Sequence, residues 1–280
     1  MTELLPKYIW HNGIIREIAE DEKKFVPYGM HSIVFQETLL SSGTGILFLG
    51  ETLRRLHYFA GIYDLSSSLL SDQSGEILSS EIKRILIRNK CYQKARCHLI
   101  FQKDSETGQT TEKIIVEPDP FLFHPSKNVA LLFPPPALNK PEGLAARLPS
   151  PEREYRKLVK MYLDRQGASD CLICNQQHQI TETYLGNLFL VEGNTVKTPA
   201  LLAGTTQGLL RQPIIDELVR RNKTIREEEN INAHHLLQAT EAFTAGTNGI
   251  FFIKGYESRR YFDGVRKDIL NAFDEIHPGF

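Results

Sequence analysis

The sequence predicts an α+β protein of two domains. Paired strands joined by turns dominate the first half of the chain, strands alternate with helices in the second half, and a proline-rich segment lies between them. The 280 residues, 41% of them hydrophobic, are enough to bury a sizeable core. We place the N-terminal domain at residues 1–120, a linker at 121–136 and an α/β-barrel-like C-terminal domain at 137–280.

The first domain is predicted to consist of hairpins and two helices. Asn12-Gly13 separates two short apolar runs and is a strong signal for a two-residue hairpin turn. Apolar residues at helical spacing predict helices at 51–63 and 79–90. Strands are expected at 8–10, 13–15, 32–38, 45–49, 96–102 and 113–117.

The second domain is predicted to open with a helix after the proline-rich linker. Ser150-Pro151-Glu152 places a capping residue, a first-turn proline and an acid in order, and the helix should end at Gly167. Further helices are expected at 209–221, 233–239 and 264–273, with strands at 170–175, 188–191, 242–244 and 250–253.

Composition excludes several classes of function. A formal net charge of -1 gives no electrostatic footprint for nucleic acid or an anionic membrane. No apolar run approaches the roughly 18 residues that span a bilayer, and the first residues lack the features of a secretory signal, so we expect a cytoplasmic protein. Cys171 and Cys174 have the spacing of half a zinc site, but no second pair accompanies them, and we expect no metal.

Glu182 draws attention because it is a lone acid placed directly before an apolar run, residues 188–191, that reads as a buried strand. A turn at Gly193-Asn194 and the pair Thr198-Pro199 follow. The alternative interpretation is that Glu182 is a solvated residue at the start of a strand.

Two glycine-bearing segments follow Glu182. Residues 203–211 form a loop that runs into a helix start, where free backbone N–H groups and the helix dipole favour an anion. Residues 243–249 form a strand that ends in Gly246-Thr247, where a hydroxyl and an N–H group can both face a phosphate. Each alone reads as an ordinary loop, but their order and spacing after Glu182 favour a phosphate site.

Together these segments resemble the fold-type IV pyridoxal-phosphate enzymes, the class IV aminotransferases. That family includes branched-chain and D-amino-acid transaminases and aminodeoxychorismate lyase. The resemblance covers nearly the whole chain and rests on Thr181-Glu182, Asn187-Leu188-Phe189, Thr198-Pro199, Gly208-Leu209-Leu210-Arg211 and Gly246-Thr247, with N-terminal matches at 10–13, 28–38 and 53–56. It implies a D-amino-acid aminotransferase-like fold with pyridoxal 5'-phosphate in the cleft between the domains, and a homodimer.

The resemblance also implies roles for individual residues. Glu182 would bond the pyridine nitrogen and keep it protonated, so that the ring acts as an electron sink. The phosphate would be held by Arg55, by the backbone of Gly208, Leu209 and Leu210, and by Thr247. The substrate pocket would include Tyr28, His31 and Asn248.

The family also requires a lysine that forms a Schiff base with the cofactor and moves a proton. Counting back from Gly167 reaches the neighbourhood of Pro149, where Arg147 is the nearby basic residue and no lysine is present. A shortened helix would bring Lys157 into register, and we take it as the catalytic residue, with Lys160 and Lys140 as alternatives.

The predicted function is therefore transamination of a small amino acid with pyridoxal 5'-phosphate. One alternative is aminodeoxychorismate lyase, which releases pyruvate in the synthesis of 4-aminobenzoate and folate and begins with the same proton abstraction. The other is a non-catalytic relative that kept the fold, since the usual lysine is out of register.

Overall fold

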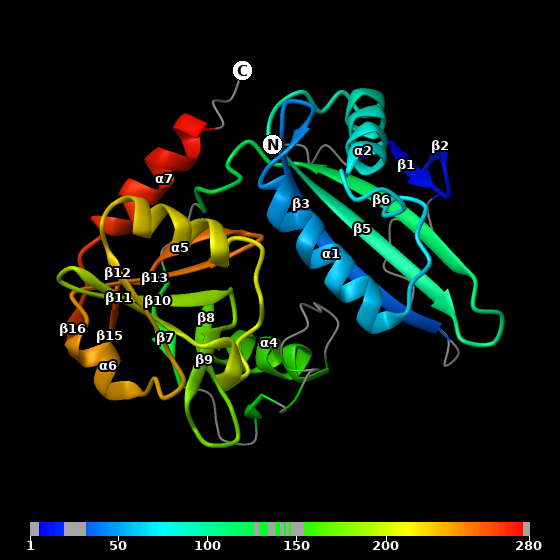
Figure 1. The fold of residues 1–280 in the computed structure, drawn as a ribbon. Coiled ribbons are helices and arrows are strands. Elements are labelled where there is room, and N and C mark those ends of the chain that lie inside the picture. Colours follow the sequence, from blue (N-terminus) through cyan, green and yellow to red (C-terminus); the bar gives the residue numbers. More distant parts are fainter. Residues whose placement is uncertain are drawn as a thin grey trace. The chain divides into compact units, whose positions relative to one another are not determined.

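The structure, a computed structural model, describes residues 6–19, 32–125, 129–133, 138–140, 143, 146 and 154–276. The chain divides into two compact units, one ending at Leu122 and the other running from Phe123 to Ile276, and each is described by itself (Figure 1). Both contain helices and sheets, so the α+β class predicted from the sequence is confirmed.

The first unit is built on a six-stranded antiparallel sheet in the order β2-β1-β6-β5-β3-β4. Helix α1 (Leu49–Tyr63) runs along β3, and helix α2 (Glu76–Arg88) contacts β1, β4 and β6 (Figure 1). The strands are β1 (Tyr8–His11), β2 (Ile14–Glu17), β3 (Ser32–Ser42), β4 (Gly45–Ile46), β5 (Ala95–Asp104) and β6 (Thr110–Pro118).

Local sequence signals account for most of these elements. Asn12 and Gly13 both adopt positive φ, 46° and 88°, as the predicted two-residue hairpin requires. Helix α2 begins three residues earlier than expected. Asp72 and Ser74 accept hydrogen bonds from the Glu76 N–H and thereby satisfy one of the donors that a helix start leaves free.

The second unit contains three sheets. A five-stranded sheet has the order β12-β11-β10-β13-β14, a three-stranded sheet has the order β7-β8-β9, and β15 pairs with β16. The strands are β7 (Leu131–Leu132), β8 (Asp170–Cys174), β9 (Ile180–Thr183), β10 (Asn187–Glu192), β11 (Thr195–Pro199), β12 (Thr224–Glu228), β13 (Glu241–Gly246), β14 (Gly249–Phe252), β15 (Gly255–Tyr256) and β16 (Arg259–Arg260). The helices are α4 (Glu154–Gln166), the 3-10 turn η3 (Leu201–Ala203), α5 (Arg211–Arg220), α6 (Ala233–Gln238) and α7 (Val265–Ile276).

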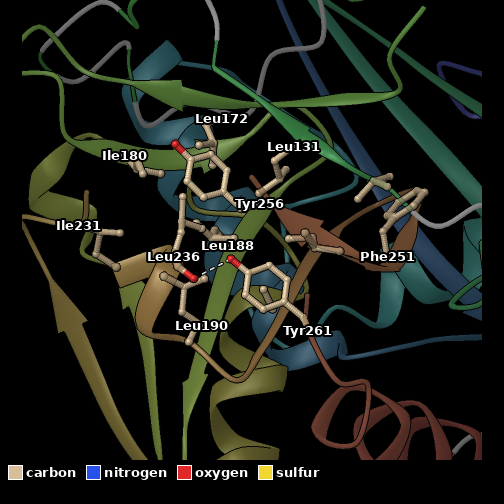
Figure 2. Packing of buried hydrophobic residues seen from close by; sticks show 14 of the residues in the cluster. Leu131, Leu172, Ile180, Leu188, Leu190, Ile231, Leu236, Phe251, Tyr256 and Tyr261 are labelled. Atoms are coloured by element: carbon tan, nitrogen blue, oxygen red, sulfur yellow. Dashed lines mark hydrogen bonds between the residues drawn. The ribbon is translucent and has the colours of Figure 1, made fainter. Parts of the chain in front are cut away.

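One apolar cluster in the described part of this unit joins strands from its three sheets. Figure 2 shows Leu172 and Ile180 beside Leu188 and Leu190, with the rings of Tyr256 and Tyr261 among them. The Tyr261 hydroxyl donates to the Leu236 carbonyl at 2.7 Å, so this phenol is buried with its polar atom satisfied. The cluster fixes β8, β9 and β10, the strands that carry the candidate site.

Six strands of this unit were not predicted from the sequence, namely β7, β9, β11, β12, β15 and β16. β11 and β12 pair in parallel, and β12 has the sequence TIREE at the edge of its sheet. A charged edge strand has no apolar alternation, and so the pattern that identifies other strands is missing.

None of the helices in the described parts of the chain has the length and apolar character needed to cross a membrane.

Candidate active site

Glu182 lies inside strand β9, opposite Ile173 of β8, and its side chain is fully buried. The sequence had placed this acid ahead of a strand. The structure forms two consecutive strands in that region. Glu182 lies in the short strand β9, and the apolar run that follows it is β10. A buried carboxylate is costly unless cations and hydrogen-bond donors surround it.

Three donors meet the Glu182 carboxylate. Lys140 Nζ lies 3.0 Å from Oε1, and Arg156 Nη2 lies 2.9 Å from the same oxygen. The Thr206 backbone N–H donates to Oε2 at 2.8 Å. Lys140 Nζ also donates to the Thr206 hydroxyl at 2.8 Å, which closes a small buried network.

These contacts decide the ionisation of Glu182. Burial alone would raise the pKa of its carboxyl, but the Lys140 ammonium, the Arg156 guanidinium and the bonds from Thr206 outweigh it and hold the pKa below its ordinary value. For Arg156, burial is opposed by the Glu182 charge and by Tyr155 and Tyr184, and its pKa is raised. The site therefore holds an anion between two cations.

Lys140 is held in place by the turn between β8 and β9. Its N–H donates to the Cys174 carbonyl at 2.6 Å, and its carbonyl accepts from Gln176 Nε2 at 3.3 Å. Beside it, Asn139 Nδ2 lies 3.3 Å from His178 Nδ1. These backbone contacts direct the Lys140 side chain inward, where it is completely buried.

Helix α4 directs the side chain of Arg156 toward Glu182, whereas Lys157 and Lys160 on the same helix are exposed. Val159 and Leu163 are buried in an apolar cluster with Cys171 and Ile173 of β8. Arg156 lies three residues before Val159 and therefore on the same face of the helix. Lys157, predicted as the catalytic residue, is exposed on α4, and Lys160 is exposed and paired with Asp164.

The loop that carries Thr206 is fixed by motif residues that hold backbone groups. The Thr205 hydroxyl donates to the Thr181 carbonyl at 2.8 Å, and Asn187 Nδ2 donates to the Thr206 carbonyl at 2.8 Å. The Thr198 hydroxyl donates to the Leu188 carbonyl, and Arg211 Nη2 donates to the Pro199 carbonyl. Much of the sequence motif thus serves to position Thr206 and the backbone near it.

Gly208 comes so close to Asn187 that no side chain fits there. A Cβ atom built on Gly208 would lie 2.2 Å from Asn187 Oδ1, far inside contact distance. Asn187 cannot yield freely, because it holds the Thr206 carbonyl. Gly208 is thus needed for the shape of the loop before α5.

The remaining residues assigned to the phosphate and the substrate lie in two turns. Leu209 and Leu210 follow Gly208, are almost fully buried, and directly precede α5. Thr247 and Asn248 occupy the turn between β13 and β14, with Thr247 partly buried and Asn248 exposed.

Arg55 lies in α1 of the first unit and is 1% exposed. Its Nη2 pairs with Glu37 Oε2 of β3 at 2.7 Å, and its Cζ lies 5.5 Å from the centre of the Phe59 ring. Among the described residues its Nε and Nη1 have no hydrogen-bond partner although they are buried. Two unused donors on a buried guanidinium suit an anionic ligand.

Three predicted positions cannot be placed. Tyr28 and His31, expected in the substrate pocket, and Arg147, expected near the usual lysine position, lie outside the described residues.

Sequence reasoning missed Arg156 and Thr206. The helical spacing of Val159 and Leu163 could have identified Arg156, because a charged residue on an apolar helix face needs a buried partner. Thr206 lies in the Gly/Thr loop that was identified, but its contact with Glu182 depends on how the loop folds.

The Cys171–Cys174 pair is divided between two apolar clusters, Cys171 in one and Cys174 in the other.

Comparison with known proteins identifies the family. A model of the amino-transferase class IV family matches residues 35–256. The chain belongs to the class IV aminotransferases. This family uses pyridoxal 5'-phosphate, as the resemblance had implied. The chain is 31% identical over 125 residues to branched-chain-amino-acid aminotransferase 5, chloroplastic, from Arabidopsis thaliana, a match that covers 41% of this chain and 30% of that relative.

Solved structures of class IV aminotransferases share the fold over nearly the full chain. The branched-chain amino acid aminotransferase of Escherichia coli has a TM-score of 0.80 at 19% identity, covering 98% of this chain and 95% of that one. An aminotransferase from Brucella abortus, solved with its cofactor pyridoxal phosphate, has a TM-score of 0.79 at 16% identity, with coverage of 96% and 98%. A putative 4-amino-4-deoxychorismate lyase from Legionella pneumophila has a TM-score of 0.75 at 16% identity, with coverage of 91% and 97%.

Proposed function

We propose that this protein is a pyridoxal 5'-phosphate-dependent aminotransferase acting on a small amino acid, with Lys140 as the lysine that binds the cofactor covalently. The observation that carries the proposal is the position of Lys140. Of the lysines in the described residues, it alone is fully buried, and its Nζ lies 3.0 Å from Glu182, the acid assigned to the pyridine nitrogen.

The residues present fit the cofactor. Glu182 is ionised, and within the described residues its Oε2 accepts a hydrogen bond from Thr206 alone, so this oxygen can also accept a ring N–H. In the same part of the chain, Arg55 has two buried guanidinium nitrogens without partners, as suits a phosphate ligand. Gly208, Leu209, Leu210 and Thr247 would complete the phosphate site.

Bound in this way, the cofactor supplies an electron sink for the substrate carbon that loses its proton. Glu182 would keep the ring nitrogen protonated, and Thr206 would hold Glu182 in place. Lys140 Nζ would take the proton from the substrate Cα and return it. To do so, Lys140 Nζ would have to leave Glu182, whose carboxylate would then pair with the ring N–H.

The proposed substrate class is a small apolar amino acid, because the curated relatives are named for branched-chain amino acids. The lyase activity on aminodeoxychorismate would begin with the same proton abstraction by Lys140. Action as a homodimer in the cytoplasm stays a prediction, as do the substrate roles of Tyr28, His31 and Asn248.

Borohydride trapping tests the assignment of the lysine. Protein incubated with pyridoxal 5'-phosphate is reduced, digested and mapped by mass spectrometry. We expect the reduced adduct on Lys140, its loss in Lys140→Met, and its retention in the matched variants Lys157→Met and Lys160→Met. An adduct on Lys157 or Lys160 would contradict the assignment to Lys140.

The same sample distinguishes the non-catalytic alternative. That alternative draws support from the ion pair that ties Lys140 to Glu182. A protein that stays colourless with added cofactor and gives no adduct is not an aminotransferase. If an adduct forms, assays with leucine, valine and alanine as amino donors and with aminodeoxychorismate separate transaminase from lyase.

A further inference from the structure

Glu182 Oε1 accepts from two cations at once, Lys140 at 3.0 Å and Arg156 at 2.9 Å. One cation is enough to neutralise one carboxylate. The second is unexplained unless one of the two has to leave during function. The proposed function requires such a departure of Lys140.

The Arg156 guanidinium is held in a fixed position by several contacts. Its Nη1 donates to the Tyr184 carbonyl at 2.8 Å while Nη2 donates to Glu182. Its Cζ lies 5.9 Å from the centres of both the Tyr155 and the Tyr184 rings. A planar guanidinium held at two nitrogens has little freedom to turn, and it remains charged at any ordinary pH.

Lys140 differs from Arg156 in each of these respects. Its ammonium ends a flexible chain of four carbons, and lysine, unlike arginine, can give up its proton. Its Nζ contacts Glu182 and the Thr206 hydroxyl, and rotation of the side chain can exchange both contacts.

We propose that Arg156 is a positioning residue that keeps Glu182 ionised and oriented by itself, so that Lys140 can leave the carboxylate without stranding a buried charge. The inference rests on the proposed function for the reason that Lys140 leaves. The claim about Arg156 and Glu182 can be tested in the protein without any cofactor.

Other titratable groups lie around Glu182 and must be separated from it in the test. Tyr155 and Tyr184 flank Arg156, and Asp170 and Cys171 begin β8. Burial raises the pKa of Asp170 to about 7 and that of Cys171 to about 12. Labelling only glutamate side-chain carboxyls with ¹³C removes all four groups from the spectrum.

The test follows the ¹³C carboxyl shift of Glu182 from about pH 9 down to about pH 5, assigned by its loss in Glu182→Gln. We expect the shift to stay constant in the wild type and in Lys140→Met, because Arg156 suffices. In Lys140→Met/Arg156→Gln the pH midpoint of the Glu182 carboxyl titration should rise by at least about 2 pH units relative to the wild type. Burial then raises the pKa of Glu182 without a nearby cation to oppose it. Lys140→Met/Arg156→Lys should restore the constant shift.

Arg165→Gln is the matched control, because Arg165 is exposed near the end of the same helix. Combined with Lys140→Met, it should leave the Glu182 signal constant. The proposal is overturned if Lys140→Met alone makes Glu182 titrate within this range, and this single variant decides the matter if the double variant does not fold. Since no cofactor is present, failure of borohydride trapping would refute the proposed function without moving this result.

Discussion

Glu182, Lys140 and Arg156 form a buried charge cluster in which the anion compensates the charge of the two cations. Taking a carboxylate out of water costs several kcal/mol, and this cost is offset only if cations and hydrogen bonds replace the lost water. Here Lys140, Arg156 and the Thr206 N–H replace it within 3.0 Å. Removal of the anion would leave two cations facing each other in the interior.

Glu182→Gln should therefore lower the free energy of unfolding at pH 7 by roughly 3–5 kcal/mol. The pKa of Glu182 is lowered from 4.5, so its contribution is present above about pH 4.5 and is lost as pH falls through the lowered value. Urea unfolding at pH 7 and at about pH 3 measures this. The matched change Glu192→Gln removes the partly exposed pair with Lys197 and should cost less than about 1 kcal/mol. Equal losses in the two variants would contradict the prediction.

Asp170 presents the opposite case, a buried acid that no cation among the described residues neutralises. Its Oδ1 accepts from the N–H groups of Cys171 and Leu185, but burial outweighs these bonds and raises the pKa to about 7. In the unfolded chain it ionises near 3.8. The stability linked to its protonated form is thus fully present below about pH 3.8 and is lost as pH rises through about 7.

Asp170→Asn keeps the Oδ1 acceptor and removes the titration. Relative to the wild type, the variant should gain roughly 2 kcal/mol of unfolding free energy between pH 5.5 and pH 8, at about 1.4 kcal/mol for each pKa unit. Urea unfolding at both pH values gives the difference. A stability gap that does not change with pH would show that Asp170 is already ionised at pH 5.5 in the folded protein.

At the level of elements, helix α4 joins the apolar core to the charge cluster. Leu163 and Val159 bury one face of the helix against β8, and this packing sets the direction of Arg156. Adjacent positions on a helix differ by about 100°, so a shift of one residue exchanges a buried position for an exposed one. For this reason Arg156 reaches Glu182 while Lys157 does not.

Leu163→Ala should cost roughly 2–5 kcal/mol, because it opens a cavity under α4. Met161→Ala is the control on the same helix. Met161 is 50% exposed, and its loss should change the stability by no more than about 0.5 kcal/mol. Chemical unfolding followed by circular dichroism compares the two. Comparable losses would mean that the packed face of α4 is assigned wrongly.

The same element shows what the sequence could predict. The capping signals at Ser150-Pro151-Glu152 and the glycine at Gly167 predicted a helix that ends before Gly167, and the motif around Glu182 identified the acid and its loop. The apolar spacing of Val159 and Leu163, which could have identified Arg156, was not used. Lys140 lies outside any helix or strand and follows a proline-rich segment, so its inward direction comes from long-range contacts with Cys174 and Gln176 that leave no local pattern.

At the scale of the whole molecule, binding of the proposed cofactor should stabilise the folded protein against heat. A ligand that binds only the folded protein stabilises it by about 2.7 kcal/mol at a hundredfold excess over Kd. Pyridoxal 5'-phosphate at that excess should therefore raise the Tm by roughly 5–10 °C.

Arg55→Gln and Glu182→Gln should each reduce that rise to about half or less at the same cofactor concentration, because each removes an ionic contact worth tenfold or more in affinity. Each variant is compared with its own Tm without cofactor, since the loss of Arg55 also leaves Glu37 without its buried partner. Arg54→Gln, an exposed neighbour in α1, should keep the full rise. Differential scanning fluorimetry gives the rise in Tm with cofactor for the wild type and for the three variants. If Arg55→Gln keeps the full rise, the phosphate is held without Arg55, and its proposed ligands are reduced to the loop at Gly208, Leu209 and Leu210 and to Thr247.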